Sequence, residues 1–249
     1  MLKKYQIAKV IQSYKTSKSQ ENKPLNTIKI EKDLAKNSDH LKNVLGKSTD
    51  VKFREIEVNY ETPINVFICF LDGLVNEDYI NLYMIKPLLE PNFTSTHSVS
   101  EDFLTVVEKQ ILSTSSIQEV RSIDEVIESV LSGETAVFID GYDSALTVST
   151  EGFEARSVEQ PDTESSVRGP REGFNEVLKV NTALIRRKIN NPNLVFESMK
   201  IGKQTKTNIR IGYINGIANP KIIDEVKQRL KRINTDMILE SGYIEQCKL

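Results

Sequence analysis

The chain has 249 residues, of which 39% are hydrophobic and 27% charged, and its formal net charge is −2. This length suits two compact units of roughly 100 residues each. The nearly neutral charge argues against a nucleic-acid-binding protein, which usually carries a strongly basic domain. The longest apolar run, around residues 66–71, is far shorter than the ~20 residues of a membrane-spanning helix, so we expect the chain as given to be soluble.

The first part of the sequence predicts a leader followed by an α/β unit over residues 37–158. Residues 1–36 are rich in lysine, serine, asparagine and glutamine, which is typical of a flexible leader. A short helix capped by Ser38 or Asp39 should come next. The elements after it are an alternating strand (51–60), a continuously apolar strand (64–73), three helices (76–90, 101–113 and 122–133) and two strands around a turn (134–150). This order favours helices packed on a mixed sheet.

The expected linker spans residues 159–171, where prolines and glycines interrupt regular structure. The second unit, 172–249, should begin with a helix over 172–189 whose apolar stripe includes Phe174 and Val177. It should continue with two strands (194–202 and 205–214), a helix (220–233) with Ile222, Ile223, Val226, Leu230 and Ile233 inward, and a last short helix near the C-terminus. The predicted fold is therefore α/β with two subdomains joined by linkers, each a small mixed β-sheet packed with helices, loosely like a solute-binding protein.

The sharpest local feature is the run Arg168-Gly169-Pro170-Arg171-Glu172-Gly173, just before the predicted helix. Backbone amides at the helix start and two guanidinium groups can hold a phosphate or a carboxylate. Alternatively, the two arginines pair with acidic residues just upstream and fix the linker. We favour this second interpretation, because contacts that hold two units together commonly use such pairs. The spacing is not that of a nucleotide-binding P-loop.

Two further features lie on the predicted helix. Asn181 falls within the apolar stripe, and a buried amide is costly unless it is hydrogen-bonded. We therefore expect it to bond to backbone of the facing unit, with a ligand as the less favoured partner. Arg186, Arg187 and Lys188 form a basic run at the helix C-terminus, which a favourable interaction with the helix dipole explains. Contact with nucleic acid or acidic lipid is the alternative.

No constellation of residues indicates an enzyme, a metal site or a cofactor. The only histidines, His40 and His97, have no partners at the spacing of zinc ligands or of a catalytic triad. Asp72 and Asp140 each precede a glycine after an apolar strand, which is typical of a turn. The two cysteines, at positions 69 and 247, lie far apart in the sequence, so we do not expect a disulfide. We expect the protein to be in a reducing compartment.

Four segments together resemble the spore germinant receptor A-subunit family, the GerA family. They are LSGETAVFIDG, RSVEQPDTESSVRGPREGFNEVLKVNTALIRRKI, IGKQTKTNIRIGYINGIANPKIIDEVKQRL and ILESGYIEQ. These motifs occur in the family's order and with its gaps. The resemblance is dense over residues 120–246 and looser before them.

The resemblance implies a role in signalling. Family members are inner-membrane proteins of bacterial spores with a large soluble N-terminal region and a C-terminal bundle of membrane helices. They assemble with a transporter-like B subunit, a lipoprotein C subunit and other A subunits, and together they sense nutrients. The chain resembles the N-terminal region alone, which would face the spore core. The membrane would be reached through a C-terminal region absent from this chain.

The resemblance carries over no catalytic residue and no cofactor. It does imply that the matching motif forms a subunit or interlobe contact. The residues expected in this contact are Pro161, Glu164, Arg168, Gly169, Arg171, Glu172, Gly173, Asn181 and Arg186. The family's nutrient pocket is usually assigned to the B subunit. Direct binding of a small germinant in a cleft between two lobes is the alternative hypothesis.

Overall fold

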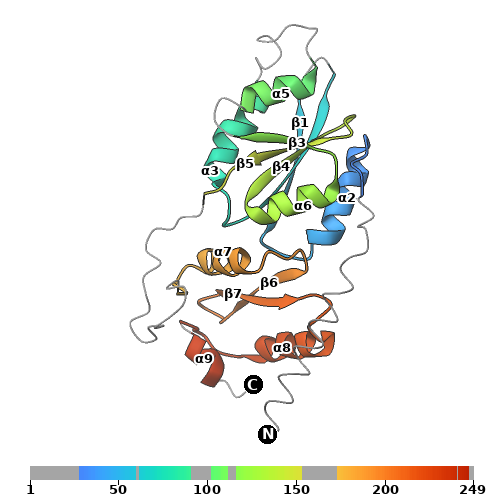
Figure 1. The fold of residues 1–249 in the computed structure, drawn as a ribbon. Coiled ribbons are helices and arrows are strands. Elements are labelled where there is room, and N and C mark those ends of the chain that lie inside the picture. The colour runs from blue at the N-terminus through green and yellow to red at the C-terminus, as the bar shows by residue number, and fades with distance from the viewer. Residues whose placement is uncertain are drawn as a thin grey trace, which may run out of the picture.

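The computed structural model describes residues 28–59, 62–90, 102–111, 116–152, 173–239 and 241–246. Within these ranges the chain is mixed α/β and contains a five-stranded sheet and a two-stranded sheet (Figure 1). We call the described residues of 28–152 the first region and those of 173–246 the second region. The two regions are stacked along the long axis of the molecule (Figure 1).

The first region is built on the five-stranded sheet, whose order is β1-β2-β4-β5-β3. Its strands are β1 (Val51–Val58), β2 (Ile64–Leu71), β3 (Ile117–Val120), β4 (Glu134–Ile139) and β5 (Ala145–Ser149). All neighbouring pairs are antiparallel, which corrects the prediction of a mixed sheet. The helical connection does make β3 and β4 run in the same direction. However, β5 lies between them and pairs with both in the opposite direction.

Strand β2 lies inside the sheet, between β1 and β4, and helices cover both faces of the sheet. Alternate residues of the strand enter two separate hydrophobic cores. Val66, Ile68 and Phe70 belong to one core, and Phe67, Cys69 and Leu71 to the other. The first core is covered by α5 (Phe103–Ile111) and by the helical segment over 77–89, and the second by α2 (Leu34–Leu45) and α6 (Ile123–Ser132) (Figure 1). The continuous apolar run in the sequence is thus explained by burial on both sides.

The helix predicted over residues 76–90 is present and contains a π-helical turn. It consists of α3 (Glu77–Tyr79), a π-helix (Ile80–Ile85) and α4 (Lys86–Leu89). Asn76 caps its start, because the side-chain oxygen accepts a hydrogen bond of 3.0 Å from the backbone N–H of Tyr79. Four residues of this segment, Ile80, Met84, Ile85 and Leu88, are buried in the first core.

The fold begins before the predicted first helix. α2 starts at Leu34 with Asp33 as its N-cap, rather than at Ser38 or Asp39. Ile30, in the segment predicted to be a leader, is 4% exposed and packs in the core beneath α2 and α6. A single apolar residue in polar surroundings has no periodicity, so the sequence did not indicate that it is anchored.

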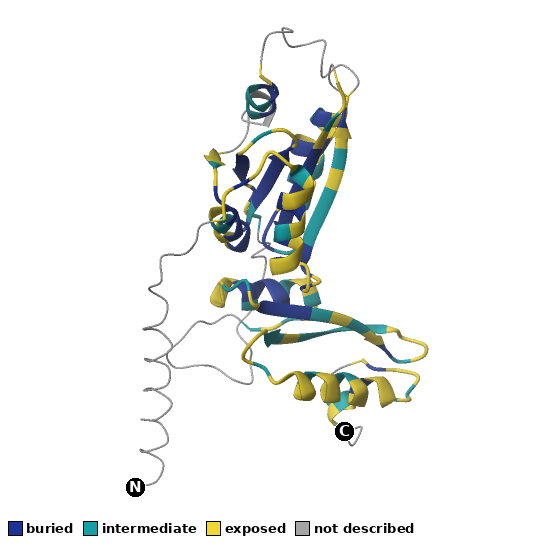
Figure 2. Ribbon diagram, turned by 90° about the vertical axis from the view of Figure 1, so that its right-hand side faces the viewer, coloured by how far each residue is buried: buried dark blue, intermediate teal, exposed yellow. Residues whose placement is uncertain are grey.

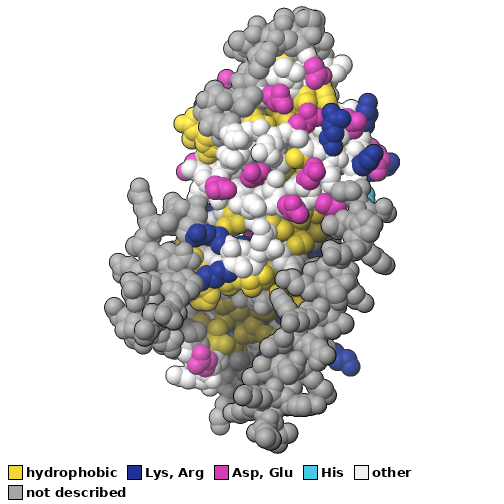
Figure 3. Space-filling view, in the orientation of Figure 1, with side chains coloured by type: hydrophobic (Ala, Val, Ile, Leu, Met, Phe, Trp, Pro, Cys, Tyr) yellow, Lys and Arg dark blue, Asp and Glu magenta, His cyan; other side chains and the backbone are white. Residues whose placement is uncertain are grey.

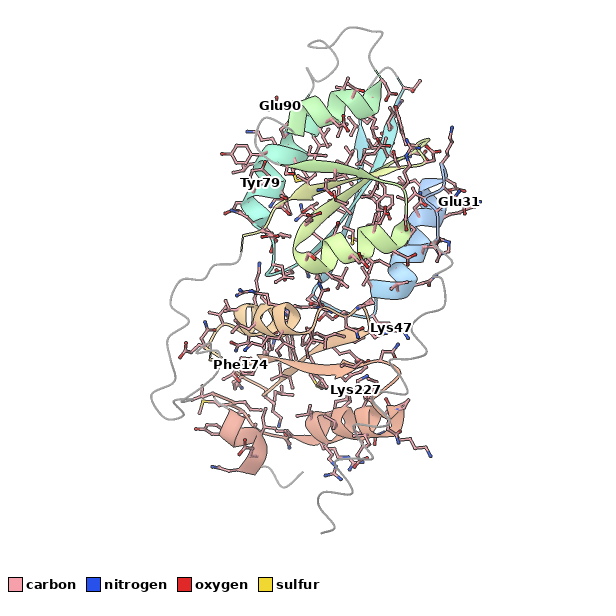
Figure 4. All side chains as sticks on the ribbon, viewed as in Figure 1. Glu31, Lys47, Tyr79, Glu90, Phe174 and Lys227 are labelled. Carbon is pink, nitrogen blue, oxygen red and sulfur yellow. The ribbon has the colours of Figure 1, made fainter. Side chains whose placement is uncertain are left out.

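The second region places two helices on opposite faces of the small sheet of β6 (Leu194–Ile201) and β7 (Thr207–Ile214). On one face, Arg210 of β7 donates a hydrogen bond to Thr182 of α7 (Leu178–Lys188). On the other, Lys227 of α8 (Pro220–Arg232) pairs with Glu197 of β6, and its side chain lies on the sheet side of α8 (Figure 4). The short helix α9 (Ser241–Gln246) follows α8.

The helix predicted over 172–189 begins only at Leu178. Phe174 and Val177, predicted to lie in its buried stripe, are exposed. Asn181 provides the physical reason, because its side chain accepts a hydrogen bond from the backbone N–H of Asn175 and donates one to the carbonyl of the same residue. These local bonds hold the preceding segment in a turn that competes with the helix.

The buried stripe predicted for α8 is also only partly correct. Leu230 is buried, but Ile222 is 63% exposed and Val226 is exposed too. A sheet of two strands is too narrow to cover the whole stripe. Figure 2 shows the same contrast at larger scale, with buried residues concentrated in the first region and mostly intermediate or exposed residues in the second.

Candidate functional site at the junction of the two regions

The centre of the junction is a buried ion pair between Arg186 of α7 and Asp50, which directly precedes β1. The side chains are 2% and 0% exposed. The Nε atom of Arg186 donates to Oδ2 of Asp50 at 2.8 Å, and a terminal nitrogen donates to Oδ1 at 3.1 Å. This two-point geometry fixes the direction in which α7 approaches the first sheet.

Both terminal nitrogens of Arg186 also donate hydrogen bonds to other groups. They reach the carbonyl oxygens of Asn191 at 3.2 Å and Leu194 at 2.8 Å and the hydroxyl of Ser48 at 3.0 Å. The guanidinium carbon lies 5.3 Å from the centre of the Phe196 ring. A buried charge is tolerated only when its hydrogen bonds are satisfied. This network meets that condition, because each of the three guanidinium nitrogens of Arg186 donates at least one hydrogen bond.

Ser48 and Thr49 connect the backbone of the first region to β6. The Ser48 hydroxyl donates to Asp50 at 2.5 Å and accepts from the backbone N–H of Phe196 at 2.8 Å. The backbone N–H of Thr49 donates to the carbonyl of Phe196 at 2.8 Å. The edge of β6 that faces away from β7 is therefore hydrogen-bonded to the loop before β1.

A second ion cluster joins the N-terminal part of α7 to the turn after β2. Lys179 pairs with Asp72 at 2.6 Å and also with Glu77. Burial would raise the pKa of Asp72, but the hydrogen bond and positive charge of Lys179 outweigh it and hold that pKa below its ordinary value. Burial would likewise lower the pKa of Lys179, and the two carboxylates raise it instead. The cluster is thus charged on both sides at neutral pH.

Gly73 lets the turn after β2 lie against α7. Its φ is +96°, and a Cβ atom at this position would lie 3.3 Å from the Cβ of Ala183 and from Lys179. A glycine is needed both for the left-handed backbone and for the close approach. Asp72-Gly73 and Asp140-Gly141 both form turns, so the interpretation of these pairs as turns is confirmed, and Asp72 has the additional role of binding Lys179.

The structure describes only some of the residues predicted to form the contact. Pro161, Glu164, Arg168, Gly169, Arg171 and Glu172 lie outside the described residues, as does the expected linker over 159–171. Gly173 is half-buried at the start of the second region, and Asn181 bonds to nearby backbone of its own region rather than to the facing one. Arg186 forms the buried pair with Asp50. The assignment of the whole set to a contact stays a prediction.

Sequence reasoning missed the partners of Arg186. Asp50 and Ser48 belong to a polar turn before an alternating strand, which is an ordinary place for exposed residues. Arg186 was explained by the helix dipole, although it stands two residues after Leu184 and one after Ile185, near the buried face. A basic residue so close to an apolar stripe was the one signal of a buried acidic partner.

The described residues give little support for a metal site, a membrane-spanning helix or a reactive thiol. No group of three or more histidine, cysteine, aspartate or glutamate side chains there could hold a metal ion. None of the helices in the described ranges is long and apolar enough to cross a membrane. Cys69 is buried in the core, and burial raises the pKa of its thiol. A thiol held in its neutral form is a poor nucleophile.

Comparison with known proteins places the chain beside spore germination proteins. The sequence model described as "Bacillus/Clostridium GerA spore germination protein" matches residues 39–248. Spore germination protein KA of Bacillus subtilis (strain 168) is 41% identical over 214 residues, which are 86% of this chain and 38% of that protein. The uncharacterized membrane protein YfkQ of the same strain is 35% identical over 96% of this chain and 44% of its own length. The chain thus spans about two fifths of the length of these relatives.

A solved structure has the same fold. It is the crystal structure of the N-terminal domain of the A subunit of the Bacillus megaterium spore germinant receptor GerK3. The TM-score is 0.68 and the sequence identity 29%, and the match covers 89% of this chain and 80% of that one.

Proposed function

Because this chain belongs to the Bacillus/Clostridium GerA spore germination family, we propose that it is the N-terminal domain of a germinant receptor A subunit. Its role is assembly of the receptor and relay of the nutrient signal during spore germination. The observation that carries the relay role is the buried pair of Arg186 and Asp50. A closed network of this kind passes a displacement of one region to the other instead of absorbing it.

The proposed partners follow from the family. They are a transporter-like B subunit, a lipoprotein C subunit and other A subunits, with no nucleic acid. The full-length protein is proposed to lie in the spore inner membrane, with this domain on the spore-core side. No enzymatic step is proposed, since the junction offers hydrogen-bonded ion pairs rather than a free nucleophile or base.

The test is a substitution of Arg186 in the full-length receptor in spores. Arg186→Lys keeps the charge but loses the two-point contact with Asp50. We expect slower nutrient-triggered germination, measured as loss of optical density, at a receptor level in the membrane equal to that of the wild type. Lys188→Gln, on the exposed end of the same helix, is the matched control. Normal germination of the Arg186→Lys spores would rule out the relay role.

A second candidate function is binding of a small germinant between the regions. A hollow of about 440 Å³ is lined by Gly73, Asn76 and Glu77 of the first region and by Lys179 and Val180 of the second. This volume is within the range of small-molecule sites. Calorimetry of the chain with amino acids, sugars and nucleosides tests it, and heat that disappears in Lys179→Met would support it. Absence of heat at millimolar ligand would exclude it.

A further inference from the structure

One edge of the small sheet, along β7, has no partner strand among the described residues. β6 and β7 form a sheet of two strands, and the other edge of β6 is bonded to the first region. The backbone N–H of Asn215 donates to the carbonyl of Asn193 at 2.8 Å, so these opposite residues form a hydrogen-bonded pair. Such pairs alternate along an antiparallel ladder. The N–H and C=O groups of Asn208, Arg210 and Gly212 therefore point away from β6, and no backbone hydrogen bond from another described segment reaches them.

This open edge lies at the bottom of an apolar hollow of about 560 Å³. The five consecutive residues 208–212 all line it, so the hollow wraps around the edge of the strand rather than over one face. Leu178 and Ile185 of α7 form one wall, and Leu230 of α8 and Ile244 of α9 form the other. Figure 3 shows hydrophobic side chains gathered in a hollowed part of the surface at the level of the small sheet.

Phe174 and Phe196 complete the hollow. Phe174 is 70% exposed and lies beside the small sheet (Figure 4). The ring of Phe196 lies over Gly212, where a Cβ atom would be only 2.9 Å from the ring. Gly212, one of the three residues whose backbone groups point away from β6, thus has no side chain of its own.

Arg210 supplies an unused positive charge at the same edge. One terminal nitrogen donates to the hydroxyl of Thr182 at 2.7 Å. Its Nε atom is buried and has no hydrogen-bond partner among the described residues, and no described carboxylate forms an ion pair with it. An unsatisfied buried donor is costly. A carboxylate brought to this position would satisfy it.

We propose that the edge of β7 accepts an extended segment of another polypeptide as a third strand, with an acidic side chain facing Arg210. The open N–H and C=O groups would provide the ladder, and alternate side chains of the segment would enter the walls formed by α7 and by α8 and α9. The β7 edge would be a surface through which the proposed assembly role acts, and to that extent the inference rests on the proposed function. The binding experiment below tests the surface alone.

The charges favour a different polypeptide over a second copy of this strand. β7 contains no acidic residue, so symmetric pairing of two β7 edges would supply no carboxylate for Arg210. It would also bring two Arg210 side chains close together, and like charges across neighbouring strands are destabilising.

The test uses the ¹⁵N-labelled chain and a synthetic heptapeptide with a central glutamate, flanked by alternating valine and threonine. We expect chemical-shift changes concentrated at residues 208–212 and slower exchange of their amide protons. A peptide methylated on the backbone nitrogens that would pair should not bind. Replacing the glutamate by glutamine should weaken binding roughly tenfold, because a charge-assisted hydrogen bond becomes a neutral one.

Three variants of the chain separate the contribution of the backbone edge from that of the charge on Arg210. Asn208→Pro removes an outward N–H without touching the ladder to β6 and should abolish peptide binding, while Asn208→Thr keeps the N–H and should bind normally. Arg210→Gln should make the glutamate and glutamine peptides bind equally. Circular dichroism confirms that the variants are folded.

Three results would overturn the proposal. They are an absence of shifts at millimolar peptide, equal binding of the methylated peptide, and a wild-type dimer in sedimentation that Asn208→Pro converts to monomer. The last would assign the edge to a second copy. Failure of the Arg186→Lys germination test with intact peptide binding would remove the relay role and leave the strand-addition site standing.

Discussion

The first and second regions bury their sheets in different ways. The five-stranded sheet of the first region has helices on both faces, and β2 residues such as Phe67 and Ile68 are fully buried. The second region sets two helices against two strands and leaves Ile222 63% exposed. An isolated two-stranded sheet is marginally stable at best. The difference teaches that the second region depends for stability on its polar attachment to the first, whereas the first region is stabilised by its own cores.

The strongest way to break this dependence is Arg186→Met. The change leaves the carboxylate of Asp50 buried without a counter-charge, and we expect a loss of about 3–5 kcal/mol in the free energy of unfolding. Urea unfolding followed by circular dichroism measures it. The double variant Arg186→Met, Asp50→Leu should lose less than the single variant, because neither charge is then stranded. Lys188→Met is the exposed control, and an equal loss in that variant would contradict the assignment.

Gly73→Ala probes the contact between the turn and α7. The alanine must adopt a left-handed backbone conformation, and its Cβ atom would lie 3.3 Å from the Cβ of Ala183. We therefore expect a loss of about 2 kcal/mol in the free energy of unfolding. Gly141 is the matched control because its φ is +89° but nothing lies within 4 Å of an added Cβ. Gly141→Ala should show only the backbone strain. If the two variants lost the same stability in thermal unfolding, the close approach would have no energetic weight.

Asp72→Asn tests the ion cluster through its pH dependence. The pKa of Asp72 is lowered in the folded state, so its contribution is present above its ordinary pKa of about 3.9 and is lost as the pH falls through the lowered value. Solvent reaches Lys179, so we expect a loss of only about 1 kcal/mol at pH 7. The difference from wild type should shrink below pH 4 in urea titrations. A difference that stayed constant with pH would point to packing instead.

Ile222→Ala should have the smallest effect. The side chain is mostly exposed, and changes at such positions usually stay within about 0.5 kcal/mol. Leu230→Ala, on the buried face of the same helix, provides the contrast and should cost clearly more. A large loss at Ile222 in chemical unfolding would show that α8 is covered to a greater extent than the described residues indicate.

The sequence predicted helices and strands best where the buried residues follow a regular pattern along the chain. The apolar strand predicted over 64–73 is β2, whose residues 66–71 are all buried, and the helix predicted over 122–133 is α6, which Ser122 caps and Gly133 ends at φ +102°. Prediction failed for the order of the strands and for the start of α7. The position of β5 between β3 and β4 depends on sheet order, which no local pattern encodes. The start of α7 was placed too early because the local bonds of Asn181 were not anticipated.

The candidate site was less predictable than the fold. Arg186 was singled out, but its partner Asp50 lies in a short polar turn with no periodic signal. Lys179 had no role in the sequence interpretation, and Asp72 was recognised only as a turn residue. Residues that join the two regions come from distant parts of the chain, and their positions depend on the fold of both regions. Their pairing can therefore be recognised only when both folds are known.

The separation of Arg186 from Asp50 along the chain has a consequence for synthesis. The two residues are 136 positions apart, and a ribosome that adds about 5–20 residues per second needs on the order of ten seconds to cover that distance. During this interval the first region can complete its own sheet while the Asp50 carboxylate is still hydrated. Attachment of α7 is then a late step of maturation, and the nascent chain passes through a state in which the surface around Ser48 and Asp50 is open to chaperones.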